Sequence, residues 1–451
     1  MEKEIAKKKE KNLLEGPMAL PIIAFALPLA LSSLLQQFFN SADVAVVGNF
    51  AGSDALAAVG ANVANVGIFV NFIVGASIGP NVVIARLIGQ GRRAEINKAI
   101  HSIMLFAIEL GIIMLGIGEA LSYPLVAFTG TPSNVVGEAL VYLRIYLLGL
   151  PFMVIYNFGA AIVRSKGETV FPLICMIVTG IVNVALNFLF VLGFHIPVSG
   201  VAIATTISNV ISSIMIIMYL MRDGAEFKFS FRKLKSVKSV NHSLIWIGFP
   251  AGIQSMVFSI SNVFIQTGIN SFGAQAIAGS SIGLNFEYYS YAFSTAFAQA
   301  AITYYSQNLG ARKYDRCNKA FRLSLFEGLL FGETLSLIFT IGREFFTRFY
   351  ASAPEALAFA CERMMHVEIL EGFTVTYEVM AGVLRSRGHS IAPAVITILW
   401  TVIFRIVWMI IVFPSLHSFG ELLDVYPISW FLCFITQYIY YRFTLQKDKK
   451  V

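Results

Sequence analysis

The sequence predicts an all-α membrane protein with 12 transmembrane helices in two pseudo-symmetric six-helix bundles. Hydrophobic residues fill 57% of the 451 positions and charged residues only 13%, about half the share usual in soluble domains. Charge-free windows such as 55–85, 196–221 and 239–286 exceed the roughly 20 residues that cross a bilayer as a helix. The other two observations are an internal repeat and the placement of the basic residues.

The second half of the chain repeats the first with a constant offset. The line that begins Gly89-Gln-Gly-Arg-Arg returns about 221 positions later as Gly310-Ala-Arg-Lys-Tyr, and each copy continues to Asn-Lys-Ala. Arg164-Ser-Lys-Gly returns with the same offset as Arg385-Ser-Arg-Gly, and a proline follows each copy. A constant offset between separate matches indicates two copies of one unit.

Apolar runs bounded by polar connections predict six helices in each copy. Their expected ranges are 18–49, 55–85, 98–122, 134–163, 169–193, 198–221, 242–270, 275–308, 318–342, 356–384, 391–415 and 425–443. The chain then divides into an N-terminal tail (1–17), a first bundle (18–221), a basic linker (222–241), a second bundle (242–445) and a C-terminal tail (446–451).

The basic residues predict how the helices are oriented. Arg92 follows the second expected helix, Lys166 the fourth and Arg385 the tenth, and the linker follows the sixth. Cytoplasmic connections carry such an excess of Lys and Arg, so both termini are expected in the cytoplasm and the chain in the plasma (inner) membrane. An even number of helices per half makes the repeats parallel. The net charge of +7 therefore reports topology, and a nucleic-acid partner is not expected.

Polar residues inside the first helix form a candidate site. Gln36, Asn40 and Asp43 fall on one face, below the kink expected at Pro28. A carboxylate in lipid costs on the order of 3 kcal/mol, so Asp43 must face protein or water. Intramembrane acids mark ion or proton paths, and we interpret Asp43 as such a group; the alternative is a structural hydrogen-bonding partner.

Further polar residues lie in later helices. Asn183 and Asn187 share one face of the fifth helix, where two amides can join helices or line a wet cavity. The second half has its own acids at Glu287, Glu371 and Glu378. The interpretation of Glu287 as a substrate group competes with a static bond to an arginine. Arg405 is a candidate partner for one of these acids, which would make that acid structural.

Motifs for catalysis are missing from the sequence. It contains no Gly-Lys-Ser/Thr phosphate loop and no histidine pair with metal-ligand spacing. We therefore expect no enzyme activity, no metal site and no cofactor.

Several segments resemble the multidrug and toxic compound extrusion (MATE) family. They are Leu27-Pro28 through Asp43-Val-Ala-Val-Val-Gly48, Asp54 to Gly60, Arg164 to Gly167 and Ser306 to Ala311. The resemblance spans nearly the whole chain and implies two bundles around a central cavity. It also implies alternating access that exports lipophilic, often cationic compounds against an inward flow of H+ or Na+.

The resemblance assigns roles to individual residues. Asp43 becomes the main coupling acid, with Asn40, Asn183 and Asn187 around it, although Asn187 occupies a position that is often aspartate. One negative charge is a thin ligand set for Na+, so H+ is the expected coupling ion and Na+ the alternative. The candidate substrate-binding residues combine polar groups with rings suited to flat cations. They are Gln36, Tyr156, Asn157, Asn262, Gln266, Glu287, Tyr288, Glu371, Tyr377 and Glu378.

Two other functions remain open at this point. A flippase for lipid-linked saccharides or peptidoglycan precursor has a related fold but usually a basic cavity, whereas the intramembrane charge here is mostly acidic. A membrane-embedded enzyme is disfavoured by the missing motifs. The expected partners are small lipophilic cations or drugs and membrane lipids, and the chain is expected to act as a monomer.

Overall fold

The computed structural model describes residues 13–448 except 130, 132, 225, 351–352 and 416–417. Most of the expected tails, 1–12 and 449–451, therefore lie outside the described residues. The first half contains α2 (Ala19–Phe50), α3 (Gly52–Ala61), α4 (Val63–Ala76), α5 (Ile78–Gly89), α6 (Arg93–Phe128), α7 (Val136–Leu147), α8 (Leu150–Ser165), α9 (Val170–Phe188), the π-helical turn η1 (Leu189–Gly193) and α10 (Pro197–Arg222).

The second half follows the same plan after a linker that contains the short turn η2 (Phe231–Lys233). Its elements are α11 (Lys238–Asn270), α12 (Ala274–Gly310), α13 (Tyr314–Ile341), α14 (Arg343–Thr347), α15 (Pro354–His366), η3 (Glu368–Phe373), α16 (Thr374–Ser386), α17 (Ile391–Ile398), η4 (Leu399–Ile403), α18 (Phe404–Val407), η5 (Trp408–Val412), η6 (Phe413–Ser415), α19 (Phe419–Leu423) and α20 (Val425–Asp448).

Joined end to end, these elements form the 12 expected spans. Eight described spans are long and apolar enough to cross a membrane by themselves, and the bent pair α7–α8 makes a ninth. The other three expected spans contain α11, α12 and α15–α16. The chain is therefore a multi-pass membrane protein.

The tenth span differs from its prediction. The sequence predicts one helix over 356–384, but the structure breaks it into α15, the 3₁₀ turn η3 and α16. A Cβ on Gly372, inside this turn, would collide with the backbone of Glu333 in α13. The break thus comes with a close approach between two helices, a tertiary contact that helical periodicity does not reveal.

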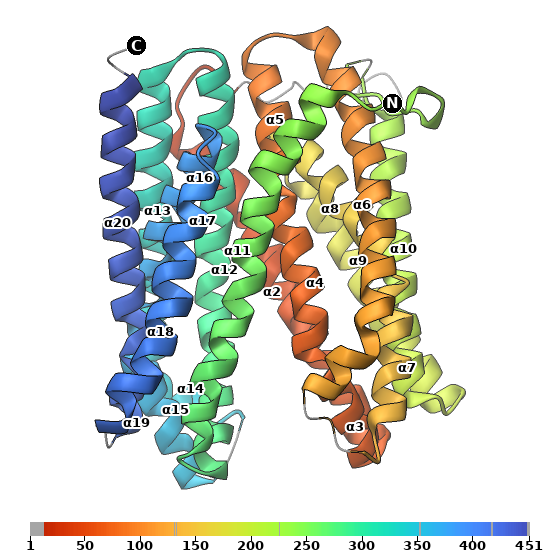
Figure 1. Ribbon diagram of the computed structural model, residues 1–451, viewed down its shortest axis with the longest axis vertical. Coiled ribbons are helices and arrows are strands. Elements are labelled where there is room, and N and C mark those ends of the chain that lie inside the picture. The colour runs from red at the N-terminus through yellow and green to blue at the C-terminus, as the bar shows by residue number, and fades with distance from the viewer. Residues whose placement is uncertain are drawn as a thin grey trace.

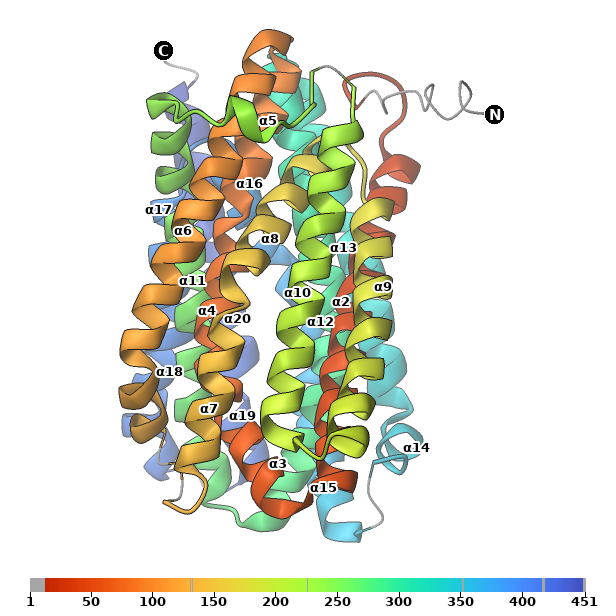
Figure 2. The same ribbon diagram turned by 90° about the vertical axis from the view of Figure 1, so that its right-hand side faces the viewer.

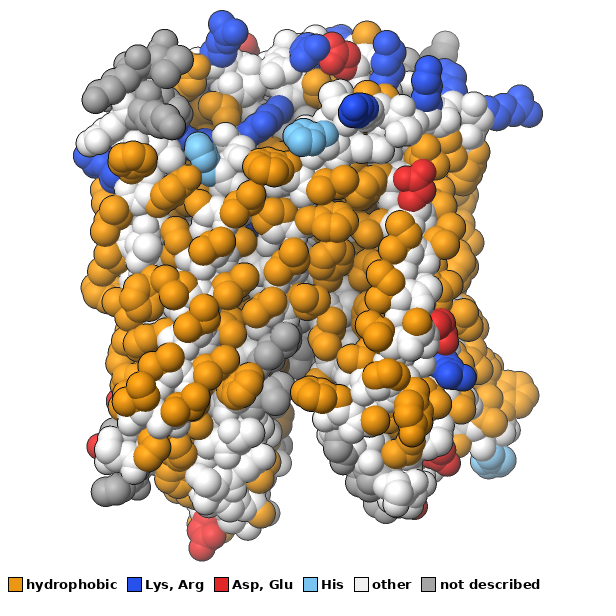
Figure 3. All heavy atoms as spheres, in the orientation of Figure 1, with side chains coloured by type: hydrophobic (Ala, Val, Ile, Leu, Met, Phe, Trp, Pro, Cys, Tyr) orange, Lys and Arg blue, Asp and Glu red, His pale blue; other side chains and the backbone are white. Residues whose placement is uncertain are grey.

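The helices form two groups that separate at one end (Figure 1). The helices α6 to α10 lie on one side and α13, α16, α17 and α20 on the other, with α2, α4, α11 and α12 between them. The turned view shows the helices running along the long axis of the molecule (Figure 2). Lys and Arg side chains gather at the opposite, closed end, and apolar side chains cover the middle (Figure 3). We call this closed end, which carries Arg92, Lys233 and Arg312, the basic end.

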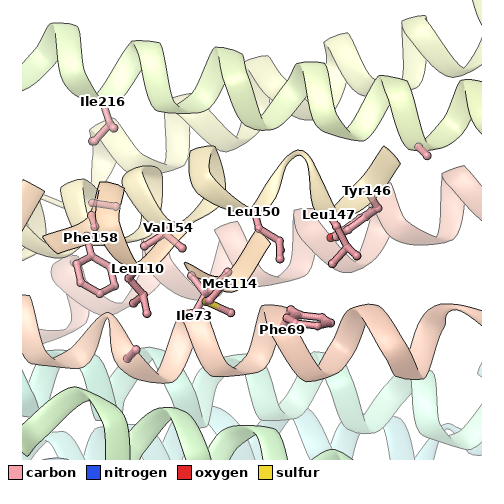
Figure 4. Close-up of a cluster of buried hydrophobic side chains, with 14 of the residues drawn as sticks. Phe69, Ile73, Leu110, Met114, Tyr146, Leu147, Leu150, Val154, Phe158 and Ile216 are labelled. Atoms are coloured by element: carbon pink, nitrogen blue, oxygen red, sulfur yellow. The ribbon is translucent and has the colours of Figure 1, made fainter. Parts of the chain in front are cut away.

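The interior of the first group is an apolar cluster, part of which Figure 4 shows. Phe69 and Ile73 on α4 meet Leu110 on α6 and Leu147 on α7, and each of these side chains is at most 7% exposed. Because lipid tails are as apolar as these side chains, close packing rather than hydrophobic transfer stabilises such a core.

The two halves meet tightly at the basic end through repeat-related residues. A Cβ on Gly89 would collide with the carbonyl oxygen of Gln307, and one on its repeat mate Gly310 with that of Arg86. The Arg86 Nε donates to the carbonyl of Ser386 (3.1 Å), and the Gln307 Nε2 donates to that of Ser165 (2.6 Å). These pairs interchange under the same offset of about 221 positions. The contact between α5 and α12 is therefore a pseudo-symmetric seal.

Candidate coupling and substrate sites

The first polar site lies between α2, α9 and α10. The Asn187 Nδ2 donates to the Asp43 Oδ1 (2.5 Å) and to the Asn183 Oδ1 (3.3 Å). The Asn183 Nδ2 donates onward to the Thr205 Oγ1 (3.3 Å). The structure thus brings together Asp43, Asn183 and Asn187, three residues that the sequence analysis grouped on other grounds.

Local packing explains why these residues meet. Asn183 and Asn187 are one turn apart on α9, so both amides lie on the same face of this helix. The ring of Phe39 on α2 lies directly against Gly180 of α9, where any Cβ would collide with it. The missing side chain lets the two helices approach closely enough for Asp43 to reach the amides.

The chemistry of this cluster suits a positively charged ligand. Asn187 is fully buried, and its Oδ1 accepts no hydrogen bond within the described part of the chain. Asp43 adds a carboxylate, and Tyr142 and Tyr146 of α7 lie within electrostatic range of it. A carboxylate beside an amide oxygen that lacks a donor offers acceptors to a cation or to an added proton.

Four other predicted residues do not join this cluster by a described hydrogen bond. Gln36 and Asn40 lie on exposed positions of α2. The Tyr156 hydroxyl donates to the carbonyl of Pro172 (3.2 Å), and the Asn157 Nδ2 donates to that of Met153 one turn earlier (2.9 Å). Their roles in coupling or substrate binding stay predictions.

The second site is a cavity of about 310 Å³ whose lining comes mostly from the second half. Six predicted substrate residues line it: Asn262, Glu287, Tyr288, Glu371, Tyr377 and Glu378. Asn71 and Ile78 of the first half complete the wall. Gln266 is not among the lining residues, and its Nε2 donates to the Asn270 Oδ1 (2.9 Å).

Glu287 forms a two-bond ion pair within the cavity wall. The Arg363 Nε donates to the Glu287 Oε1 (2.6 Å), and the Arg363 Nη2 donates to the Oε2 (2.8 Å). The Arg363 Nη1 donates to the Ser280 Oγ (2.8 Å), and both members of the pair are buried. This is the static bond to an arginine that the sequence leaves open, and it neutralises Glu287.

The other cavity acids have different surroundings. Glu378 accepts a hydrogen bond from the Tyr291 hydroxyl (3.0 Å), whereas Glu371 is 5% exposed and takes part in no ion pair found among the described residues. Arg385 also lines this cavity, where its Nη2 donates to the Gln254 Oε1 (2.7 Å). Arg385 therefore lies in the last turn of α16 and not, as predicted, in the connection after it.

Arg405 does not form the predicted ion pair with one of these acids in the structure. Its Nε donates to the Ser429 Oγ (3.0 Å), and its Nη1 donates to the Asn262 Oδ1 (3.4 Å). The guanidinium lies over the ring of Tyr426, 4.4 Å from the ring centre. With Arg363 and Arg385, it is a third buried arginine in this half. These arginines offset only part of the acidic charge, because Glu287, Glu327, Glu368 and Glu371 are all buried in the same half.

The sequence analysis missed the contributions of Gln254, Tyr426 and Trp430 to the cavity wall. A signal existed for Gln254, because it precedes Phe258 and Asn262 at steps of four and so shares their face of α11. Tyr426 and Trp430 repeat the same step on α20. Among the described residues, no group of three His, Cys, Asp or Glu side chains is placed to hold a metal ion.

The fold and these sites define a class: a multi-pass membrane protein built from two parallel six-helix repeats, with a polar cluster or cavity in each. The pattern of the MatE family matches residues 28–189 and 250–411, so the second match begins 222 residues after the first. The chain therefore belongs to the MATE family of multidrug and toxic compound extrusion transporters. The match also confirms the internal repeat.

Individual relatives cover nearly the whole chain. The "Probable multidrug resistance protein YoeA" of Bacillus subtilis is 24% identical over 99% of this chain and 97% of its own length. The "Probable multidrug resistance protein NorM" of Thermotoga maritima is 25% identical over 88% of this chain and 87% of its own. A solved MOP superfamily transporter from Pyrococcus furiosus superimposes with a TM-score of 0.90 at 18% identity, covering 98% of this chain and 99% of that one. This likeness confirms the predicted fold.

Proposed function

We propose that this protein is a secondary multidrug efflux antiporter, which exports lipophilic, often cationic compounds in exchange for H+ by alternating access. The observation that carries the proposal is the hydrogen-bonded chain from Asp43 through Asn187 to Asn183, set apart from the larger cavity. Relatives named as multidrug resistance proteins support the substrate class. The basic end is then cytoplasmic, and the separated ends of the two helix groups face outward.

In this mechanism, the cavity binds the substrate and the Asp43 cluster binds the proton. The cavity, with the carboxyl groups of Glu371 and Glu378 and the ring of Tyr288, accepts the substrate. Asp43 alternates between an ionised form and a form neutralised by a proton. One conformation of the transporter favours the ionised form, and the other favours the protonated form. Proton binding and substrate release are therefore coupled through the conformational change.

A flippase for phosphate-bearing lipid precursors is the second candidate, and Arg385 in the cavity wall is the observation that favours it. Its guanidinium is already bonded to Gln254 and lies close to the carboxylate of Glu378. Three glutamates, but only this one arginine, are among the lining residues of the cavity. We therefore retain export of cations as the main proposal.

Transport is expected to follow the pH gradient and to persist without Na+. The Asp43 cluster supplies one negative charge and neutral amides, which replace the hydration of Na+ poorly but suffice for a proton. Purified protein in proteoliposomes, with a fluorescent lipophilic cation as substrate, checks this under separate pH and Na+ gradients. A need for Na+ at equal pH on both sides would contradict H+ coupling.

Alternating access also requires the seal at the basic end to open and close. We expect Gly89→Val to hold this end open, because the new side chain would collide with the backbone of Gln307. Export should fall at least about tenfold, since close helix contacts of this kind depend on small residues. Spin labels at Gln90 and Arg312 should report a wider separation than in the parent protein.

The matched control is Gly116→Val, because a Cβ at this exposed position of α6 meets open space. It should leave both export and the label separation unchanged. If Gly89→Val behaves like this control, the contact between α5 and α12 is not the seal.

A further inference from the structure

A second cavity lies at the basic end, on the boundary between the two halves. It measures about 240 Å³ and is lined by the end of α5, the start of α6 and the start of α11. We call it the seam pocket. Its lining residues are Val83, Arg86, Leu87, Gln90, Arg92, Glu95, Lys98, Ala99, Val237, Ser239, Val240 and Ser243. The residues of the substrate cavity and of the Asp43 cluster are not among them.

The charge of the seam pocket is positive. Arg86, Arg92 and Lys98 line it together with one acid, Glu95. The carboxylate of Glu95 already pairs with Arg92, whose Nε donates to its Oε1 (2.7 Å). Lys98 forms no ion pair found within the described residues. The pocket therefore has more positive charge than its own acid can neutralise.

Two long helices begin at this pocket and add to its positive potential. The residues before their first turns, Arg92 for α6 and Val237 for α11, both line the pocket, and neither caps its helix with a side chain. Helix N-termini carry a partial positive charge and unpaired N–H groups, which attract anions. The start of α11 lies beside Ser102, nine residues into α6, so the two termini lie at different heights along α6, about 13 Å apart along its axis.

Hydrogen bonds hold the start of α11 and the linker against the side of α6. The Val237 N–H donates to the Ser102 Oγ (3.0 Å), and the Ser102 Oγ donates to the Asn241 Oδ1 (2.7 Å). Further back, the linker is tied to α6 where the Ser230 N–H donates to the Nε2 of His101 (3.1 Å). Figure 2 shows the linker between α10 and α11 crossing beside α5 and α6 at this end. The start of α11 is thus fixed against α6 beside the seam pocket.

The position and lining of the pocket suit an amphiphilic ligand. Trp246, one turn below Ser243 on α11, is 50% exposed and stacks on His242. Exposed tryptophans are enriched at the headgroup level of membranes. Val83, Leu87 and Val240 contribute an apolar part to the lining. A basic pocket between transmembrane helices at this level is the usual setting for an anionic lipid headgroup.

We infer that the seam pocket binds the phosphate of an anionic phospholipid from the leaflet at the basic end. The phosphate lies beside Lys98 and Arg92 in the seam pocket, and the glycerol region contacts the apolar wall. Because α6 belongs to the first half and α11 to the second, the bound lipid ties the halves together next to the seal. It therefore favours the conformation closed at this end.

Binding of phosphatidylglycerol and phosphatidylcholine to the detergent-solubilised full-length protein, measured by native mass spectrometry, tests the inference. The parent protein should bind phosphatidylglycerol at least about tenfold more tightly than phosphatidylcholine, because each basic side chain near an anionic lipid contributes to the binding free energy. The variant Arg92→Gln/Lys98→Gln should lose this preference. The control Lys233→Gln/Lys235→Gln removes the same charge from exposed linker residues outside the lining and should keep it.

Equal loss in both double variants would mean general surface attraction and would overturn the inference. The single variant Lys98→Gln changes an exposed side chain and should fold even if the double variant does not. It should weaken the preference for phosphatidylglycerol in part. A comparison with inorganic phosphate distinguishes a lipid headgroup from a free phosphate as the ligand. If it protects the parent protein, but not the pocket variant, from thermal unfolding while phosphatidylglycerol has no effect, the ligand is a free phosphate and the lipid assignment is wrong.

Discussion

Asp43→Asn is expected to abolish ion-coupled export of cationic compounds while the protein remains folded. Asparagine keeps the shape of the side chain at the contact with Asn187 but removes the only carboxylate in this cluster's described hydrogen bonds. Without a group that gains and loses a proton, proton flow down the pH gradient can no longer drive export. Efflux from proteoliposomes under an imposed pH gradient should fall to background, at least about a hundredfold, as for the loss of an essential proton-transfer group.

Asp54→Asn provides the matched control, because it makes the same chemical change at an exposed position of α3. It should transport like the parent protein. Unchanged efflux in Asp43→Asn would remove Asp43 from the mechanism. Failure of that variant to fold would show that the carboxylate is a structural bond between α2 and α9.

Arg363→Gln is expected to destabilise the protein strongly. It leaves the carboxylate of Glu287 buried without its two charge-assisted hydrogen bonds and leaves the Ser280 hydroxyl without the guanidinium. Removing one member of a buried ion pair typically costs about 3–5 kcal/mol. The apparent melting temperature in detergent should fall far more than for a surface substitution such as Arg312→Gln.

The double variant Glu287→Gln/Arg363→Gln separates structure from function at this pair. It should recover much of the lost stability, because no unpaired charge remains buried. Its export of cationic and neutral compounds should fall by the same factor if the pair only holds α12 against α15. A selective loss of cation export in Glu287→Gln, with stability intact, would instead restore the prediction that Glu287 binds substrate.

The number and order of the spans could be predicted because bilayer thickness imposes them. Long charge-free windows and the repeat offset place each helix within a few residues of its observed bounds. The end of α16 shows where this reasoning stops. Arg385 looks like the start of a basic connection, yet α16 continues to Ser386. Helical side chains lean toward the N-terminus of their helix, so the guanidinium points back into the membrane region and reaches Gln254.

The candidate site could be predicted only in part, for a similar reason. Spacing places Asn183 and Asn187 on one face of α9, but which helix that face meets depends on packing, such as that of Phe39 against Gly180. Charge partners are less predictable still. The acid at Glu287 is evident in the sequence, whereas its pairing with Arg363 joins positions 76 residues apart. The seam pocket likewise depends on where the linker returns to α6.

Proton movement driven by a substrate gradient tests the antiport proposal most directly. Proteoliposomes with equal pH and no Na+ on both sides, and a pH-sensitive dye inside, receive a lipophilic cation outside. Because coupling is reciprocal, substrate that enters through the protein must drive protons out, so the lumen should become alkaline in the parent protein and stay unchanged in Asp43→Asn. Substrate entry without any change in lumenal pH would contradict proton antiport.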